Sequence, residues 1–408
     1  MEQPETASLN STEPGLVSCV TLRQRFIGRF PHARPADALT ETEIQQLTSI
    51  SKIASRPQLV YLAFGAETYH QEAVFSIASA LAGMRDTPES ALDIQVFSDD
   101  PAPYRHLPVR VRRFDAPTRR SWSGPYGYHF RCKQVLVRKV LEECDKAILI
   151  DTDTFFQESP LKLFERVQPG KLLCNAFTLR YDACKQTVLY TALAEKLAQR
   201  GLADDSMPLL NSGVIGLTRE DAGILEHSVE LMDEFFPITP GAITLEEFCL
   251  AVAAYRKVQV DECPDLIHHY WSRKQLFRAK VRAWLSKHGD NPTSQNGLDD
   301  TRKVTSSLPR PPVWQRLMYK GAMFAVPQDQ RQFVREVLYG CCDYPNEFDR
   351  ACSKVWWDKA LSNAEQRMDR PLTPEKIKQW LNHWAVRQML GPQREAVYQH
   401  LLQREKNP

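Results

Sequence analysis

The sequence predicts an α/β fold with a mainly parallel, doubly wound central sheet, followed by a helical C-terminal region. Two observations predict it. Between residues 58 and 150, three short apolar segments alternate with two amphipathic segments of helical spacing, which is typical of a βαβαβ arrangement. The apolar segments are continuous rather than alternating, which indicates strands that are covered on both faces of the sheet. With 408 residues, 43% of them hydrophobic, the chain is long enough to bury a large core.

Residues 1–57 are predicted to form an irregular leader followed by one helix. Thr40 and Glu43 fit a capping box, and Ile44 and Leu47 begin an apolar stripe at helical spacing. The first fifteen residues are acidic and polar without an apolar segment, so the sequence predicts neither a secretory signal nor a basic transit peptide.

Residues 58–286 are predicted to form one α/β domain. Its elements follow in order as the strand "LVYLAF", the helix "EAVFSIASALAGM", the strand "DIQVFSDD", the helix "CKQVLVRKVLEEC" and the strand "KAILID". Further strands are expected at "KLLCNAFT", "VIGLT" and "VQVDECP", with helices over 188–200 and 244–255. In a sheet of this kind, ligands bind beyond the carboxyl ends of the strands.

The remaining chain divides into a connection and a helical region. Residues 287–312 are rich in turn-forming residues and indicate a linker or a long surface loop. Residues 313–408 are predicted to be helical. Within them Thr373 and Pro374 mark a helix start, and the apolar face of that helix is expected to continue to Trp384.

Composition narrows the functional class. A formal net charge of +2 gives no support for nucleic-acid binding. No apolar run approaches the ~20 residues that cross a bilayer, so a membrane contact would be peripheral. The ten cysteines are scattered without paired ligand spacing, which favours reduced thiols and a cytoplasmic location.

The segment "KAILIDTDTFF" carries the strongest chemical signal. Asp151 and Asp153 follow the third predicted strand and, two residues apart, point to the same side. Two like charges so close repel, and a shared divalent cation relieves that repulsion because Mg²⁺ and Mn²⁺ prefer carboxylate oxygens. The alternative is that either aspartate caps the following turn, and Asp-x-Asp alone is a common triplet. Its place at the end of a nucleotide-binding type of sheet favours the metal site.

Over residues 58–275 the chain resembles nucleotide-sugar glycosyltransferases of the GT-A fold, closest to the glycogenin-like family 8 pattern. "LVYLAFGAETYHQEAVFSIASAL" resembles the opening strand, loop and helix, and "FRCKQVLVRKVLEECDKAILIDTDTFF" resembles the helix with a basic pair that leads into the metal-binding strand. "PLLNSGVIGL" is similar to the Asn-Ser/Ala-Gly strand, and "HHYWSRK" has the spacing of the late His-x-x-Gly-x-x-Lys motif, with Trp271 in the glycine position.

The resemblance implies a set of site residues. Asp151, Asp153 and His268 (or His269) would hold Mn²⁺, or alternatively Mg²⁺; an imidazole ligand tilts the choice to manganese. Residues implied to bind the donor nucleotide are Ala63, Phe64, Tyr69, Arg131, Lys133, Thr152, Ser212 and Lys274. Residues implied to act in catalysis are Asn211 and the pair Glu246 and Glu247, which replaces the family's Asp-Gln; a helix N-terminal acid is the plain alternative for that pair. The loop "SWSGPYGYHFRC" is expected to close over the donor.

The implied activity is that of a hexosyltransferase that moves a sugar from a UDP-sugar to a glycan, lipid-linked or protein acceptor with retention of anomeric configuration. Inversion is the alternative if Glu246 or Glu247 lies below the acceptor hydroxyl as a general base. One alternative is a catalytically silent GT-A binding or scaffold protein. Another is a haloacid-dehalogenase-type phosphatase with Asp151 as nucleophile, although Phe155 stands where that motif has Thr or Val.

Overall fold

A computed structural model describes residues 56–88 and 91–406; the helix predicted around Thr40 and Glu43 lies outside them. Seven strands form the central sheet in the order β3-β2-β1-β4-β7-β6-β8. Strands β3, β2, β1 and β4 are parallel, β7 runs antiparallel to β4 and β6, and β8 is parallel to β6. The predicted α/β fold with a mainly parallel sheet is thus confirmed. The strands are β1 (Gln58–Ala63), β2 (Asp93–Ser98), β3 (Arg110–Arg113), β4 (Lys146–Ile150), β6 (Lys171–Arg180), β7 (Pro208–Thr218) and β8 (Gln259–Glu262).

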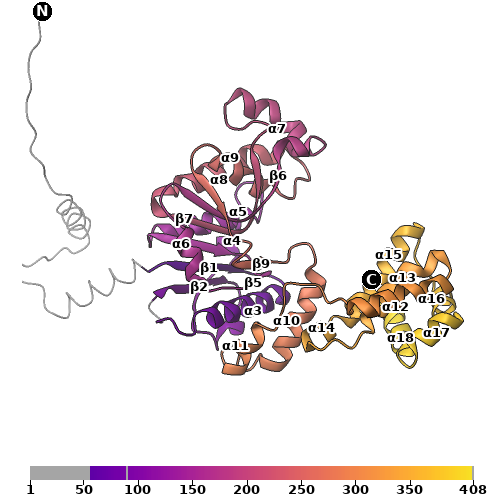
Figure 1. Ribbon diagram of the computed structural model, residues 1–408. Helices are drawn as coiled ribbons and strands as arrows, with labels where there is room; N and C mark the ends of the chain where they lie inside the picture. The colour runs from indigo at the N-terminus through magenta and orange to yellow at the C-terminus, as the bar shows by residue number, and fades with distance from the viewer. Residues whose placement is uncertain (1–55, 89–90, 407–408) are drawn as a thin grey trace, which may run out of the picture. The chain divides into compact units, whose positions relative to one another are not determined.

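Helices cover both faces of the sheet, as Figure 1 shows. On one face lie α3 (Glu67–Gly83), α10 (Lys274–His288) and α11 (Gln295–Thr301); on the other lie α5 (Arg131–Leu141), α8 (Gly223–Phe235) and α9 (Leu245–Ala254). The alternation of strand side chains separates the two cores: Leu59 and Tyr61 pack on the α3 side, and Val60 packs on the α5 side. The continuous apolar character of β1 follows from this double burial.

A second, two-stranded sheet pairs β5 (Thr154–Phe156) with β9 (Ile267–His269). The strands are antiparallel, with Thr154 opposite His269 and Phe155 opposite His268. β9 is only three residues long and was not among the strands expected from the sequence. Its pairing matters for function because it brings the histidines beside the segment that carries the two aspartates.

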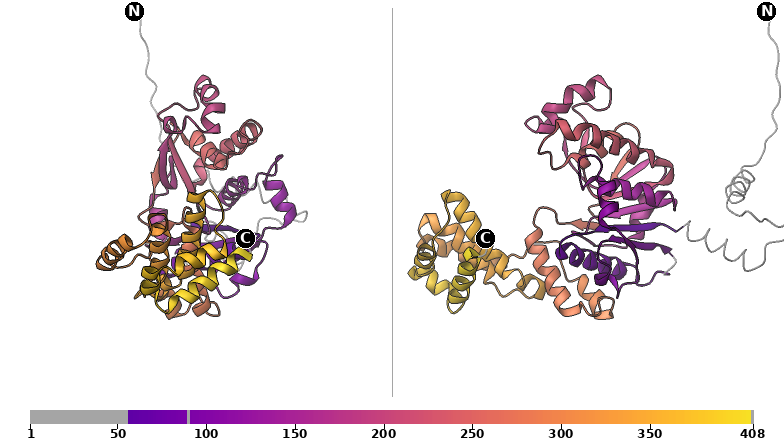
Figure 2. Two further views of the ribbon diagram at one scale, coloured as in Figure 1. Left: turned by 90° about the vertical axis from the view of Figure 1, so that its right-hand side faces the viewer. Right: turned by 180° about the vertical axis from the view of Figure 1, so that it is seen from behind.

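Three shorter helices complete this domain: α4 (Ala116–Trp122), α6 (Leu161–Arg166) and α7 (Val188–Gln199). α7 lies in the connection between the end of β6 and the start of β7, as the turned views in Figure 2 also show. Part of the segment 287–312 is helical. Its helix α11 packs against α3 and α10, and Trp284 donates a hydrogen bond from Nε1 to the Gly297 carbonyl at 3.0 Å.

The C-terminal region is helical and has its own core, in which Phe333 and Trp380 are fully buried. Thr373 caps α16 by accepting from the Lys376 N–H. The expectation that the same apolar face continues to Trp384 is wrong: α16 ends at Leu381 and a new helix begins at Trp384, so the helical spacing is interrupted and Trp384 is 67% exposed. The helices are α12 (Val313–Ala322), α13 (Arg331–Gly340), α14 (Glu347–Arg350), α15 (Ser353–Met368), α16 (Pro374–Leu381), α17 (Trp384–Leu390) and α18 (Gln393–Lys406).

The cysteines in the described part of the chain, Cys341 and Cys342 among them, are free thiols. None of the helices within residues 56–88 and 91–406 has the length and apolar character needed to cross a membrane.

Candidate active site

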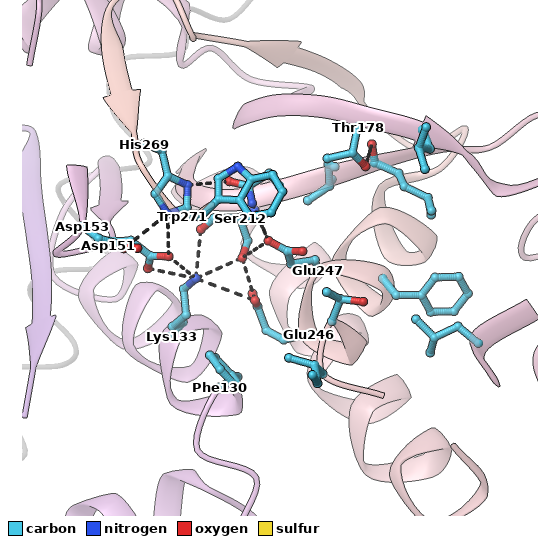
Figure 3. A pocket seen from close by; sticks show the side chains of 18 of the residues that line it. Phe130, Lys133, Asp151, Asp153, Thr178, Ser212, Glu246, Glu247, His269 and Trp271 are labelled. Carbon is cyan, nitrogen blue, oxygen red and sulfur yellow. Dashed lines mark hydrogen bonds and ion pairs between the residues drawn. The ribbon is translucent and has the colours of Figure 1, made fainter. Parts of the chain in front are cut away.

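The candidate site lies where β4 ends, beside the point at which the strand order reverses between β1 and β4. β4 ends at Ile150, and the Asp151 N–H donates to the Gly213 carbonyl on β7 at 2.9 Å. The Thr154 hydroxyl closes the turn by donating to the Asp151 carbonyl at 2.9 Å. These bonds hold the Asp151–Asp153 segment in place, and Figure 3 shows both carboxylates turned toward the same group of side chains.

Of the two histidines, His269 lies with the aspartates and His268 does not. His269 Nε2 is 3.3 Å from Asp153 Oδ1 and 4.0 Å from Asp151 Oδ2. His268, the next residue along β9, points to the opposite side, where its ring packs on Phe155 and Phe277. Burial lowers the pKa of His268 to about 4, so it is neutral at physiological pH.

The hydrogen bonds around His269 fix its tautomer. The backbone N–H of Gly213 donates to Asn211 Oδ1 at 3.1 Å, which makes that atom an acceptor. His269 Nδ1, 2.8 Å from the same oxygen, must therefore carry a proton and donate it. In a neutral imidazole this leaves a lone pair on Nε2, directed at Asp153. Asn211 acts here as a positioning residue for the histidine.

This arrangement fits a hard divalent cation. Asp151, Asp153 and His269 each offer one ligand atom, and the three atoms lie within 4.8 Å of one another. The Nε2 lone pair and a carboxylate oxygen face each other across 3.3 Å, so this contact needs a proton or a metal ion between them. Two carboxylates and one imidazole suit Mn²⁺ and also Mg²⁺. The residues present therefore fit the group that the sequence predicts.

Two lysines neutralise the carboxylates in the structure. Lys133 Nζ lies 2.9 Å from Asp151 Oδ1, and Lys274 Nζ lies 2.7 Å from Asp153 Oδ2. Burial alone would raise the pKa of Asp153, but the Lys274 ammonium and a His269 ring that carries a proton on Nε2 when no metal is bound hold it well below its ordinary value. The two lysines differ in freedom: the Lys274 side chain is 40% exposed, whereas that of Lys133 is 11% exposed. Lys274 can therefore turn to another anion more readily than Lys133, provided that another positive charge compensates the buried Asp153 carboxylate.

Lys133 belongs to a buried network with Ser212 and Glu246. Its ammonium donates to the Ser212 carbonyl and hydroxyl at 3.0 Å each, in addition to Asp151. Ser212 Oγ donates to Glu246 Oε2 at 2.6 Å, and Gln134 donates to Glu246 Oε1 at 3.0 Å. Burial opposes the charge of Lys133, yet the Asp151 and Glu246 carboxylates keep its pKa above the ordinary value. Glu246 thus has both oxygens engaged and holds Lys133 in position.

Glu247 lines the site differently from Glu246. Its Oε1 accepts from Asn211 Nδ2 at 2.9 Å and from the Ser212 N–H at 3.0 Å. No side chain or backbone group of the described residues donates to its Oε2. Burial, and after it the neighbouring Glu246 carboxylate, raises the pKa of Glu247 to about 7. Glu247 is therefore the titratable acid of the site, with one oxygen left for a bound molecule.

The raised pKa of Glu247 predicts a specific pH dependence of stability. The Glu247 carboxyl binds its proton more tightly in the folded chain than in the unfolded chain. The free energy of unfolding therefore falls as pH rises from about 4.5 to about 7. We expect Glu247→Gln to stabilise the metal-free protein at pH 8, by at most about 3 kcal/mol, and to change little at pH 4. Urea unfolding at both pH values with a chelator present measures the difference.

Glu142→Gln at the end of α5 is the control for this measurement, because the Glu142 side chain is exposed. It is expected to have no such pH-dependent effect. An equal change at pH 4 and pH 8 for Glu247→Gln would contradict the assignment.

Two cavities meet at the carboxylates. One, of about 540 Å³, is lined by Phe64, Tyr69 and Thr152; the other, of about 410 Å³, is lined by residues that include Asn211 and Glu247. Both share Phe130, Lys133, Asp151, Asp153 and Lys274. A bound molecule could therefore extend from the first cavity past the carboxylates into the second.

The structure places most of the predicted site residues at these cavities, with three exceptions, the first of which is His268, whose ring packs on Phe155 and Phe277 instead. Ala63 is buried within β1, and Arg131 forms a bidentate ion pair with Asp233 at 2.9 Å; neither lines the two cavities. His129 and Phe130 of the "SWSGPYGYHFRC" loop do line the larger one.

Arg119 also lines the larger cavity, although no motif in the sequence indicates it. It lies on α4 with its guanidinium 5.6 Å from the centre of the Phe64 ring. Arg119 belongs to the basic segment 109–120, and such a segment is also typical of a solvated surface. Only the position of Arg119 shortly after β3 could have indicated that it lines a binding cavity.

No protein-family model matches the chain, and no curated protein matches it in sequence. Among solved structures, it is similar to the galactosyltransferase LgtC in complex with donor and acceptor sugar analogues, at 15% identity over 64% of this chain and 99% of that one, with a TM-score of 0.39. It is also similar to apo mouse xyloside xylosyltransferase 1, at 15% identity over 51% of this chain and 85% of that one, with a TM-score of 0.36. The bifunctional glycosyltransferase WbbM matches at 14% identity over 52% of this chain and 39% of that one, with a TM-score of 0.34. At these identities the likeness concerns the fold alone.

Proposed function

We propose that the chain is a metal-dependent hexosyltransferase of the GT-A fold, similar to family 8, which transfers a hexose from a UDP-sugar to a glycan, lipid-linked or protein acceptor. The observation that supports this most is the cluster of Asp151, Asp153 and His269 at the junction of two cavities. A donor and an acceptor must meet at one reacting carbon, and two cavities that share a charged junction provide that arrangement.

The larger cavity suits the nucleotide. Phe64 and Tyr69 offer aromatic faces to a base, and Arg119 adds a cation above Phe64. Asp151, Asp153 and His269 would hold a divalent ion, manganese in this proposal, which would supply positive charge for the diphosphate leaving group. Lys274 shares the cavity, and its half-exposed ammonium moves from Asp153 to a donor phosphate.

The smaller cavity suits the transferred sugar and the acceptor. Glu247, with Oε2 free, and Asn211 offer hydrogen bonds to sugar hydroxyls. In the transfer, the acceptor oxygen forms a bond to the anomeric carbon while the bond from that carbon to the diphosphate oxygen breaks. The electron pair leaves with UDP, and the acceptor's hydroxyl proton passes to the departing diphosphate. Lys133 holds Asp151 in place throughout.

Release of UDP tests the proposal. Incubation with a panel of UDP-hexoses and Mn²⁺, with water as acceptor, is expected to release UDP from at least one donor, and a chelator is expected to stop the release. Metal-dependent UDP binding without release from any donor, even with glycosides added, would favour a silent binding protein. Phosphate release from sugar phosphates without nucleotide binding would favour a phosphatase with Asp151 as nucleophile.

The proposal includes retention of anomeric configuration, which is determined from the configuration of the product. Proton NMR of the newly formed anomeric centre is expected to show the α configuration that the donor carries. A β product would contradict retention and would assign Glu247, whose pKa of about 7 suits a general base, to deprotonation of the acceptor.

A further inference from the structure

The smaller cavity has a half that is far from the carboxylates and built from aliphatic side chains. Figure 3 shows Thr178 at this far end and Asp151 and Asp153 at the other. Five aliphatic residues form what we call the aliphatic wall; they come from β6, α7, β7 and the segment before α9, and are Leu179, Leu189, Leu209, Leu210 and Ile243. Phe248 on α9 lines the same cavity.

Polar groups are scarce along the aliphatic wall. Apart from the charged and hydrogen-bonded residues at the carboxylate end, and Trp271, the described residues that line this cavity and carry a side-chain heteroatom are Thr178, Cys184 and Thr244. The Thr178 hydroxyl already donates to the Leu209 carbonyl at 3.2 Å. A sugar ring bound here would bury hydroxyls without partners, at a cost of roughly 1–3 kcal/mol for each. The half therefore suits an apolar group better than a second sugar.

The aliphatic wall has a buried floor and an open mouth. Leu189 and Leu210 form the floor and are almost fully buried, whereas Leu179 is 58% exposed and Ile243 is 79% exposed at the mouth. Large aliphatic side chains left in water beside a cavity are typical of a surface that an apolar ligand covers. A ligand that runs from floor to mouth would remove apolar area on both sides from water.

The aliphatic wall is continuous with the reacting end of the cavity. Asn211 and Glu247 line the same cavity as Leu210 and Phe248, so one molecule can place a hydroxyl beside Glu247 and an apolar substituent along the wall. We propose that the acceptor is an amphiphile: a hydroxyl-bearing polar head joined to an alkyl or isoprenoid chain. This inference rests on the proposed glycosyl transfer and selects the lipid-linked class among the three acceptor classes.

Alkyl glycosides of increasing chain length test the proposal. The assay contains Mn²⁺ and a UDP-hexose that the protein has been found to turn over. It compares methyl, butyl and hexyl β-glucosides and β-galactosides as acceptors, by the rate of UDP release above the rate with water alone. We expect kcat/KM to rise about two- to fourfold for each added methylene, with the change in KM and little change in kcat. Calorimetric titration of the same glycosides gives the chain-length dependence of binding without any need for turnover.

Substitutions at the mouth of the aliphatic wall test whether the alkyl chain binds there. Leu179→Ser and Ile243→Ser are expected to reduce the ratio of kcat/KM for hexyl over methyl glycoside toward one. Ile238→Ser is the matched control, because Ile238 is also an exposed aliphatic, at 42%, and does not line the cavity. It is expected to leave the ratio as in the wild-type protein.

The outcomes separate this proposal from the proposed function. A flat chain-length series with intact UDP release, or efficient transfer to a short hydroxyl-bearing peptide and not to hexyl glycosides, would overturn the amphiphilic acceptor and leave the transferase standing. Chain-length-dependent binding that Leu179→Ser removes, without UDP release from any donor, would support the apolar site and overturn the proposed transfer. No UDP release together with no chain-length-dependent binding would overturn both.

Discussion

Asp153→Asn is expected to abolish metal-dependent UDP binding and to lower the rate of UDP-sugar turnover by about 10³-fold or more. The physical reason is that a bound divalent ion supplies several kcal/mol of charge stabilisation, and each 1.4 kcal/mol changes a rate tenfold. Asp153 contributes a carboxylate that faces His269 at 3.3 Å, and asparagine retains the volume without the charge. Calorimetry of UDP with and without Mn²⁺ measures the binding, and UDP release measures the turnover.

The fold is expected to survive this substitution. Lys274, the ion-pair partner of Asp153, is 40% exposed and can be solvated when the carboxylate is removed, so the usual penalty for an unpaired buried charge is small. Asp261→Asn is the matched control, since Asp261 also pairs with a lysine, Lys171 at 3.0 Å, but lies on the edge strand β8. Unchanged Mn²⁺-dependent UDP affinity in Asp153→Asn would contradict the account.

Gly213→Ala is expected to have the second largest effect, because a methyl group there occupies the place of the His269 ring. A β-carbon built on Gly213 would lie 2.2 Å from His269 Nδ1, far inside van der Waals contact. His269 must then leave Asn211 and the aspartates. We expect metal affinity to fall at least 10- to 100-fold, as when outer supports of a metal ligand are removed, and UDP release to fall with it. Mn²⁺ titration followed by electron paramagnetic resonance measures the affinity.

Two controls make this prediction specific. Gly223→Ala, where nothing lies within 4 Å of the added carbon, is expected to bind metal normally. In a His269→Ala background the ring is absent, so adding Gly213→Ala is expected to cause little further loss. If the two substitutions instead reduced metal affinity independently, the effect of Gly213→Ala would come from another contact than His269.

Much of the candidate site can be predicted from the sequence because its signals are local. Asp151 and Asp153 follow an apolar strand after two βα units, and that order alone puts them at the functional edge of the sheet. The choice between His268 and His269 is not local. It depends on the register of the short strand β9 against β5, more than one hundred residues away in the chain, and no periodicity in three residues defines a face.

Other features of the site depend on tertiary neighbours. The pKa of Glu247 is raised by burial and by Glu246, and neither effect can be read from "TLEEF". Arg131 belongs to a basic pair in sequence, but Asp233 on α8 engages it away from the cavities. The aliphatic wall is assembled from four separate segments, of which only the β7 strand carries a recognisable motif.

The central claim is that Asp151, Asp153 and His269 together bind one divalent ion that holds a nucleoside diphosphate. A crystal grown with UDP and Mn²⁺, measured at the manganese absorption edge, tests it most directly. The account predicts one anomalous peak in contact with both carboxylates and with His269 Nε2, next to the diphosphate, with Lys274 moved from Asp153 to a phosphate oxygen. Bound UDP with Lys274 still paired to Asp153, and no peak between the aspartates and His269, would contradict it.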